Sequence, residues 1–241
     1  MSVRWHTYPG PDEAAEACGH HIAALLEEAV AGQECASLAL SGGTSPVRLF
    51  RNLAGARLPW NRIHIFWVDE RCVPPSDPQS NYRLAEEHLI RPAHIPQRQV
   101  HRIDGELHPE HAARRYVQEI QDFFNLEPGG LPHFDVMQLG MGTDAHTASL
   151  FPGSPLIEDR ERIAAALFAE QQKQWRVTLL PGVIMAARHT VFLVTGEEKA
   201  EAVRNVFKGE YDASRYPAQM ASHHSRRVAW FLDDAAAALM D

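Results

Sequence analysis

The stretch FDVMQLGMGTDAHTASLFPGS, from Phe134 to Ser154, contains the features that decide the fold. Its apolar start, 134–139, predicts a buried strand that ends at a glycine-containing turn. In open parallel sheets, ligands bind beyond the carboxyl ends of the strands, so polar side chains in this turn are candidate catalytic groups. We take Asp144 and His146 as those candidates. The alternative is a turn in which Asp144 caps the next helix and His146 is simply exposed.

A second turn with a similar design follows the small apolar strand predicted over 36–40. It consists of Ser41, Gly42, Gly43 and Thr44, and Pro46 then fits the first turn of a helix. Glycines let backbone N–H groups approach a phosphate, and a helix start adds partial positive charge, so the turn predicts an anion site. It lacks the GxxxxGK[ST] pattern of a Walker A loop. A plain left-handed turn would use the same glycines.

Charged residues follow two further predicted strands. The strand at 62–68 (RIHIFWV) ends in Asp69, Glu70 and Arg71, which form either a solvated strand end or a second wall of the same crevice. The strand at 190–194 runs into a turn and helix start that places Lys199 within reach of that crevice.

The remaining pattern alternates strands with helices and shows no linker. Helices are expected over 12–31, 81–89, 109–124 and 233–240, and strands over 100–103, 163–167, 176–180 and 227–232. Such alternation favours an α/β fold with three layers, in which a mostly parallel, Rossmann-like sheet is covered by helices on both faces. We expect one domain over residues 1–241.

Composition limits the partners and the compartment. The formal charge of −8 argues against a nucleic-acid binder, which needs a basic face. The three cysteines form no CxxC pair, which is typical of a reducing compartment. Neither a signal peptide nor an 18-residue apolar stretch is apparent, so we expect a cytoplasmic protein with no membrane partner. Oligomeric state is open, with a monomer as the simplest expectation.

Five motifs follow one another in order from roughly Ser41 to Ala200: SGGTSPVRLF, FWVDERCVPPSDPQSNYRLA, LGMGTDAHTASLFPGSP, RVTLLPGVIMAARHTVFLVTG and EEKA. Together they resemble the 6-phosphogluconolactonases of the pentose phosphate pathway. The related glucosamine-6-phosphate deaminases share the SGG turn and an Asp-x-His turn, but usually have Tyr where this chain has Arg71, and continue differently after the His. Both differences favour the lactonases.

The resemblance implies hydrolysis of 6-phospho-D-glucono-1,5-lactone to 6-phosphogluconate without a cofactor. His146 would be the general base, because an ordinary histidine, with a pKa of about 6.5, can take a proton from water near neutral pH. Asp144 would orient or bind nearby.

The other implied roles concern the substrate. Its phosphate would lie on the turn from Ser41 to Thr44 beside Arg176 and Lys199. Arg71 would bind the phosphate or the developing carboxylate, and Asp69 would hold sugar hydroxyls.

One residue departs from the lactonase pattern: the family usually has Gly between the Asp and the His, whereas this chain has Ala145. An alanine at positive φ would cost on the order of 1 kcal/mol. We expect an ordinary backbone conformation here.

Two cofactor interpretations rank low. The histidine pairs His20–His21 and His223–His224 point to different faces of a helix or strand, and HExxH is absent, so no metal is expected. A GxGxxG/A match at 140–145 is weak evidence for NAD on its own.

Two other functions are kept as alternatives: a glucosamine-6-phosphate deaminase/isomerase-like enzyme, which would release ammonia, and a non-catalytic sugar-phosphate sensor, which would bind without turnover.

Overall fold

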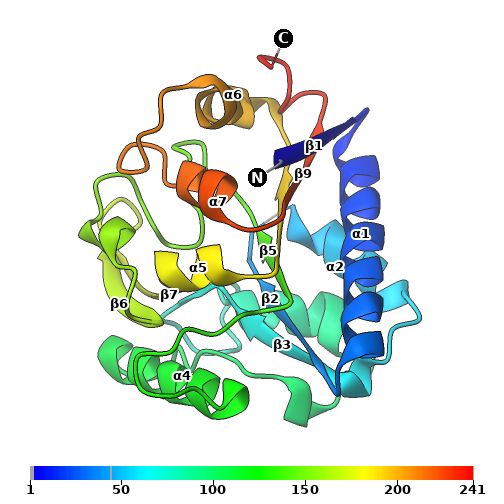
Figure 1. The fold of residues 1–241 in the computed structure, drawn as a ribbon, viewed down its shortest axis with the longest axis vertical. Helices are drawn as coiled ribbons and strands as arrows, with labels where there is room; N and C mark the ends of the chain where they lie inside the picture. The colour runs from blue at the N-terminus through cyan, green and yellow to red at the C-terminus, as the bar shows by residue number, and fades with distance from the viewer. Residues whose placement is uncertain (1–2, 44, 241) are drawn as a thin grey trace.

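The computed structural model describes residues 3–43 and 45–240 and contains a six-stranded parallel sheet (Figure 1). In spatial order its strands are β1 (Val3–Tyr8), β9 (Val228–Asp233), β8 (His189–Val194), β5 (Val136–Leu139), β2 (Ala36–Leu40) and β3 (Ile63–Trp67). All five neighbouring pairs run parallel. The central strands β2 and β5 are apolar and fully buried, as expected when helices cover both faces of a sheet.

Helices cover both faces of this sheet (Figure 1). On one side lie α1 (Pro11–Gly32) and α2 (Pro46–Gly55), and on the other lie α5 (Pro181–Ala186), α6 (Ala200–Lys208) and α7 (Ala218–His224). Helix α1 buries a stripe at a spacing of four residues, from Ala14 through Ile22 to Val30, against the sheet. The predicted three-layer α/β fold is confirmed.

A second, three-stranded sheet adds an antiparallel element that the sequence pattern did not reveal. Its order is β4 (Asp69–Arg71), β7 (Gln174–Leu179), β6 (Ala164–Ala169), and helix α4 (Pro109–Phe124) packs against it. The strands predicted at 163–167 and 176–180 are therefore real, but they form a hairpin that also holds the charged strand end at Asp69.

Two of the expected elements are wrong and one is modified. The segment 233–240 forms turns, because Asp233 Oδ1 accepts hydrogen bonds from Gly196 and Ala236, and so short a helix is marginal on its own. The segment 100–103 makes only an isolated bridge from Val100 to Ile65. The helix expected over 81–89 is α3 (Asn81–Ala85), continued by a π-turn.

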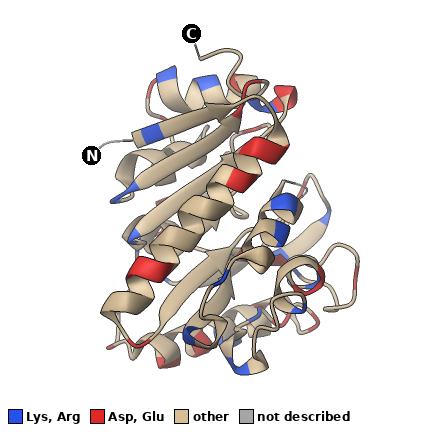
Figure 2. Ribbon diagram, turned by 90° about the vertical axis from the view of Figure 1, so that its right-hand side faces the viewer, with Lys and Arg blue, Asp and Glu red and all other residues tan. Residues whose placement is uncertain are grey.

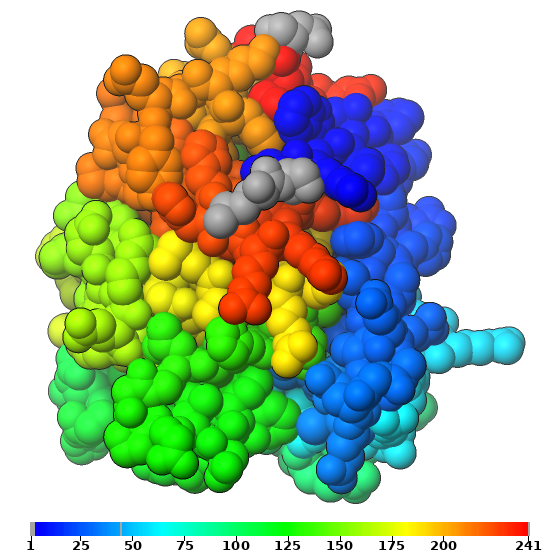
Figure 3. Space-filling view, in the orientation of Figure 1, coloured from blue at the N-terminus to red at the C-terminus, as the bar shows by residue number. Residues whose placement is uncertain are grey.

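The beginning and end of the described chain lie side by side. Strand β1 pairs with β9 over six residues, and the blue and red segments adjoin in the space-filling view (Figure 3). Among the described residues, no helix combines the length and apolar character needed to span a bilayer.

Candidate active site

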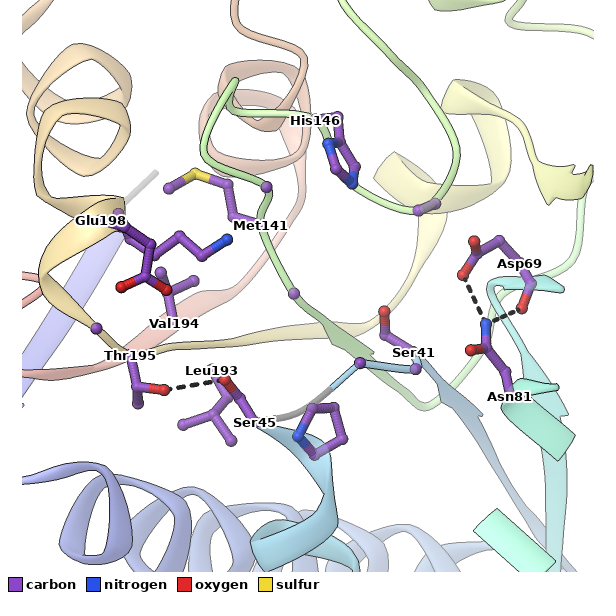
Figure 4. A pocket seen from close by; sticks show the side chains of 18 of the residues that line it. Ser41, Ser45, Asp69, Asn81, Met141, His146, Leu193, Val194, Thr195 and Glu198 are labelled. Carbon is purple, nitrogen blue, oxygen red and sulfur yellow. Dashed lines mark hydrogen bonds between the residues drawn. The ribbon is translucent and has the colours of Figure 1, made fainter. Parts of the chain in front are cut away.

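A cavity of about 440 Å³ opens beyond the carboxyl ends of β2, β5 and β8, where ligands bind in open parallel sheets. Eight of the ten predicted site residues line it: Ser41, Gly42, Gly43, Asp69, Arg71, His146, Arg176 and Lys199. Thr44 lies outside the described residues. Asp144 does not line the cavity but forms a hydrogen bond with His146, which does. Figure 4 shows Asp69 at one side of the pocket, Glu198 at the other, and His146 between them.

His146 is held by the carboxylate two residues before it. His146 Nδ1 lies 2.6 Å from Asp144 Oδ1, and the backbone N–H of His146 donates to the same oxygen over 3.1 Å. Because an ionised carboxylate only accepts hydrogen bonds, Nδ1 is the donor, and in the neutral imidazole Nε2 is then the nitrogen with the lone pair. The ring also packs on Phe151, with centroids 4.7 Å apart. Asp144 therefore fixes both the orientation and the tautomer of the imidazole.

The pKa of Asp144 agrees with this role. Burial acts to raise the pKa of this carboxyl, but the hydrogen bonds and charge of His146 outweigh burial, so the pKa lies below its ordinary value. The carboxylate is thus ionised throughout the neutral range.

The turn that carries His146 has an unusual backbone. Ala145 has φ 62°, so the expectation of an ordinary conformation is wrong. Both of its peptide groups are fixed, since Ala145 N donates to Gly142 O and Ala218 N donates to Ala145 O. No helix follows the turn directly, so Asp144 is not a helix cap. A Cβ on Gly142 would overlap the His146 ring, which restricts that position to glycine.

Asp69 is buried at the opposite wall and is fixed by hydrogen bonds. Ser149 Oγ donates to Asp69 Oδ2 over 2.7 Å, and Asn81 Nδ2 donates to the Asp69 carbonyl over 2.9 Å. Arg176 Nη1 lies 3.7 Å from Asp69 Oδ2. The carboxylate thus keeps one oxygen, Oδ1, with only a long contact of 3.4 Å to Asn81. That oxygen can accept a hydrogen bond from a hydroxyl group of a ligand.

One interpretation of the sequence places Glu70 at a solvated strand end, but its carboxylate is buried. Its carboxylate accepts hydrogen bonds of 2.7 Å from the backbone N–H groups of Arg71, Asn81 and Tyr82, and one of 3.0 Å from Ser80 Oγ. Burial raises its pKa, and these four hydrogen bonds act in the opposite direction. Glu70 therefore holds in place the loop that carries Asn81.

Arg71 and Arg176 are direct partners across the antiparallel pair β4 and β7. Burial lowers the pKa of Arg176, and the charge of Arg71 lowers it further, while Asp69 opposes both. The Nε atoms of both arginines are buried and have no hydrogen-bond partner among the described residues. Like charges opposite each other on strands are destabilising, so an anion bound between these guanidiniums would relieve a repulsion.

The wall beyond β8 is built by side chains from three elements. The backbone N–H of Gly196 donates to both carboxylate oxygens of Asp233, at 3.0 and 3.1 Å, which ties the turn before Lys199 to the end of β9. Ser45 Oγ and Thr195 Oγ1 lie 2.9 Å apart and join the first turn of α2 to the same wall.

Sequence reasoning missed three residues that shape this site. Asn81 is predicted only as the first residue of the helix over 81–89, whose cap is Ser80, since Ser80 Oγ accepts from Arg83 N. Asp233 was placed in a helix, and Ser149 was treated as part of a motif with no role of its own. Asn81 and Ser149 both fall within the motifs that resemble the lactonases, and that is the one signal the sequence offers for either residue.

Among residues 3–43 and 45–240, no cluster of three or more His, Cys, Asp or Glu side chains is arranged to hold a metal ion.

The family model described as glucosamine-6-phosphate isomerases/6-phosphogluconolactonase matches residues 9–230. The chain belongs to this family.

Relatives named 6-phosphogluconolactonase are similar in sequence to this protein along most of its chain. A 6-phosphogluconolactonase of Nostoc sp. is 37% identical over 218 residues, which is 90% of each chain. The human 6-phosphogluconolactonase is 37% identical over 210 residues, covering 85% of this chain and 80% of the human one.

Solved structures with similar folds include a lactonase and a deaminase. The 6-phosphogluconolactonase of Trypanosoma brucei covers 100% of both chains with a TM-score of 0.90 and 28% identity. A monomeric glucosamine-6-phosphate deaminase has a TM-score of 0.82 but only 22% identity, and shows the shared fold alone.

Proposed function

We propose that this chain hydrolyses 6-phospho-D-glucono-1,5-lactone to 6-phosphogluconate, the lactonase reaction of the oxidative pentose phosphate pathway. The observation that carries the proposal is the Asp144–His146 pair, in which Nδ1 is occupied by Asp144 and Nε2 is left as the available nitrogen of a ring that lines a pocket with two arginines and a lysine. The names of the lactonase relatives support the same activity.

His146 acts as general base in this proposal. Its Nε2 takes a proton from water as the water oxygen attacks C1 of the lactone, and the carbonyl oxygen becomes an oxyanion. When the tetrahedral intermediate collapses, the bond from C1 to the ring oxygen breaks, and His146 returns its proton to that oxygen. A positioned base of this kind contributes about 100- to 10,000-fold, and the rest comes from positioning and from donors to the oxyanion.

The phosphate is held by the glycine turn from Ser41 to Gly43, with Arg176 and Lys199 supplying positive charge. Arg71, as the cross-strand partner of Arg176, binds either that phosphate or the carboxylate as it forms. Asp69 accepts hydrogen bonds from sugar hydroxyls through Oδ1. These groups give a protein with a net charge of −8 a local site for an anion.

The experiment is a coupled assay in which glucose 6-phosphate dehydrogenase generates the lactone and 6-phosphogluconate formation is timed against spontaneous hydrolysis. Wild type should accelerate the reaction, and His146→Ala should remove at least about 99% of the acceleration. His20→Ala, an exposed histidine on α1, is the matched control and should be unchanged. Full activity of His146→Ala would refute the base assignment, and ammonia release from glucosamine 6-phosphate would favour the deaminase.

The remaining roles can be separated with two substrates. Arg176→Ala should raise KM for the phosphorylated lactone and leave KM for gluconolactone nearly unchanged. The same comparison with Arg71→Ala distinguishes phosphate binding from carboxylate binding. Equal effects of Arg176→Ala on both lactones would count against its phosphate role.

We also infer that residues 1–241 act as one sugar-phosphate-binding unit, since turns from both sheets line the same pocket. The acidic charge and cysteine content support a cytoplasmic monomer without a nucleic-acid partner.

A further inference from the structure

A second group of cations lies at the amino-terminal ends of the strands of the main sheet, whereas the active site lies at their carboxyl ends. Arg4 lies near the start of β1, Arg227 immediately precedes β9, and Arg188 immediately precedes β8, and these three strands are neighbours. Figure 2 shows Lys and Arg positions in a row along the ends of adjacent strands. Strand β8 has six residues at about 3.3 Å each, so these amino-terminal strand ends are roughly 20 Å from the active-site turns.

Strand register places several of these side chains on one face. Arg4 pairs with Ala229, and Ala229 pairs with Val191. Arg227 and His189 each precede one of these partners by two residues, so they point to the same side as Arg4. The residues His21 and Leu25 of α1 line the same hollow as Arg4 and His189, which identifies this side as the one that α1 covers.

The surface here is hollowed into a groove. Two adjoining hollows of about 380 and 300 Å³ share Leu25, His189, Arg226 and Arg227. Arg188 lines the first and Arg4 the second. We call the two together the arginine groove. Its size suits a small molecule, and Leu25 supplies an apolar contact.

The arginine groove carries more positive than negative charge. The side chains of Arg4 and Arg226 make no ion pair or hydrogen bond with any of the described residues, and the Arg227 guanidinium has one polar partner among them, His189 Nε2, at 3.3 Å. Of the two acidic residues that line the groove, Asp135 is buried and already engaged: it accepts from the backbone N–H and hydroxyl of Ser37 and lies 3.4 Å from Arg188. Glu28 is the other.

The C-terminal end of α1 does not oppose an anion here. Arg62 donates hydrogen bonds of 2.6 to 2.9 Å to the carbonyls of Val30, Gln33 and Glu34. One carbonyl of the last turn and those of the two residues that follow the helix are therefore paired with a cation, which offsets the negative end of the helix dipole.

We propose that the arginine groove binds a small phosphate-bearing anion at a site separate from the active site. Guanidinium groups match phosphate oxygens in a forked geometry, and three of the four arginines are free or nearly free to turn toward a ligand. The neighbouring imidazoles respond to such a ligand: burial lowers the pKa of His189, and the charge of Arg227 lowers it further. A bound anion would raise that pKa.

The test uses inorganic pyrophosphate as the probe and the His189 imidazole resonances, assigned with His189→Gln, as the readout. Wild type and Arg176→Ala should both show saturable shifts of His189, with its titration midpoint moved to higher pH. The double variant Arg226→Glu/Arg227→Glu should bind at least about tenfold more weakly and should keep full lactone turnover.

A matched control excludes a general effect of charge. Arg51→Glu/Arg57→Glu makes the same change in net charge at two exposed arginines on and just after α2, and should bind pyrophosphate as wild type does. The proposal is overturned if His189 does not respond in wild type, or if Arg226→Glu/Arg227→Glu retains wild-type affinity. Neither result bears on lactone hydrolysis, which is assayed separately.

Discussion

At the scale of single residues, the contact between Asp144 and His146 decides what the site can do. The 2.6 Å hydrogen bond that Nδ1 donates to Asp144 Oδ1 leaves Nε2 as the ring nitrogen available to act as a base. Asp144 does not line the cavity, so we regard it as a positioning residue.

The first prediction concerns this carboxylate. Asp144→Asn should lower kcat by at least about tenfold with little change in KM, because an amide holds the tautomer less firmly than a carboxylate.

The Asp144→Asn variant should also be less stable to urea. Since the folded-state pKa of Asp144 is depressed, its contribution to stability is present above the ordinary value of 3.8 and is lost as pH falls through the lower folded value. The difference in urea midpoint should therefore be constant near neutrality and narrow in acid. A difference that grows on acidification would contradict this.

A second prediction follows from the left-handed backbone of Ala145, whose side chain is fully buried. Ala145→Gly relieves about 1–2 kcal/mol of strain but loses a buried methyl group, worth about 0.8 kcal/mol, and adds about 0.5–1 kcal/mol of backbone entropy cost. The free energy of unfolding should change by less than about 1 kcal/mol. Ala145→Val should lose more than about 2 kcal/mol, because a β-branched side chain is strongly disfavoured at positive φ. Urea denaturation of both variants measures this, and a stable Ala145→Val would show that the turn can relax.

At the scale of elements, the turn after β2 and the start of α3 fit together closely. A Cβ on Gly42 would overlap the amide of Asn81, whose Nδ2 donates to the Asp69 carbonyl. Gly42 is thus required by a neighbour from a different element, in addition to any need for backbone access to phosphate.

This contact predicts a coupled pair of mutations. Gly42→Ala should displace the Asn81 amide and reduce kcat/KM by about 10- to 100-fold. In the Asn81→Ala background, where the overlap is absent, the same change should cost much less, giving a coupling energy above about 0.5 kcal/mol. Additive effects of the two substitutions would show that Gly42 acts only through its own backbone.

At the scale of the whole molecule, the parts predicted correctly are those encoded locally. Apolar runs and glycine turns near Gly42 and Gly142 indicated the parallel sheet, its helices and the turns that line the pocket. The parts missed depend on contacts between distant residues. Ser149 donates to Asp69, 80 residues away, and Arg71 pairs with Arg176 between strands β4 and β7, which lie about 100 residues apart in the chain, so no local pattern specifies the pairing. The left-handed φ of Ala145 contradicts the local preference of alanine, and the surrounding hydrogen bonds hold it.

The pairing of β1 with β9 bears on how the molecule is made. Among the described strands, β1 (Val3–Tyr8) hydrogen-bonds only to β9 (Val228–Asp233), so β1 is synthesised more than 200 residues before its partner exists. Asp233, which anchors the turn before Lys199, arrives equally late. During synthesis the emerging chain therefore carries an unpaired strand edge and an unfinished pocket until β9 has been made.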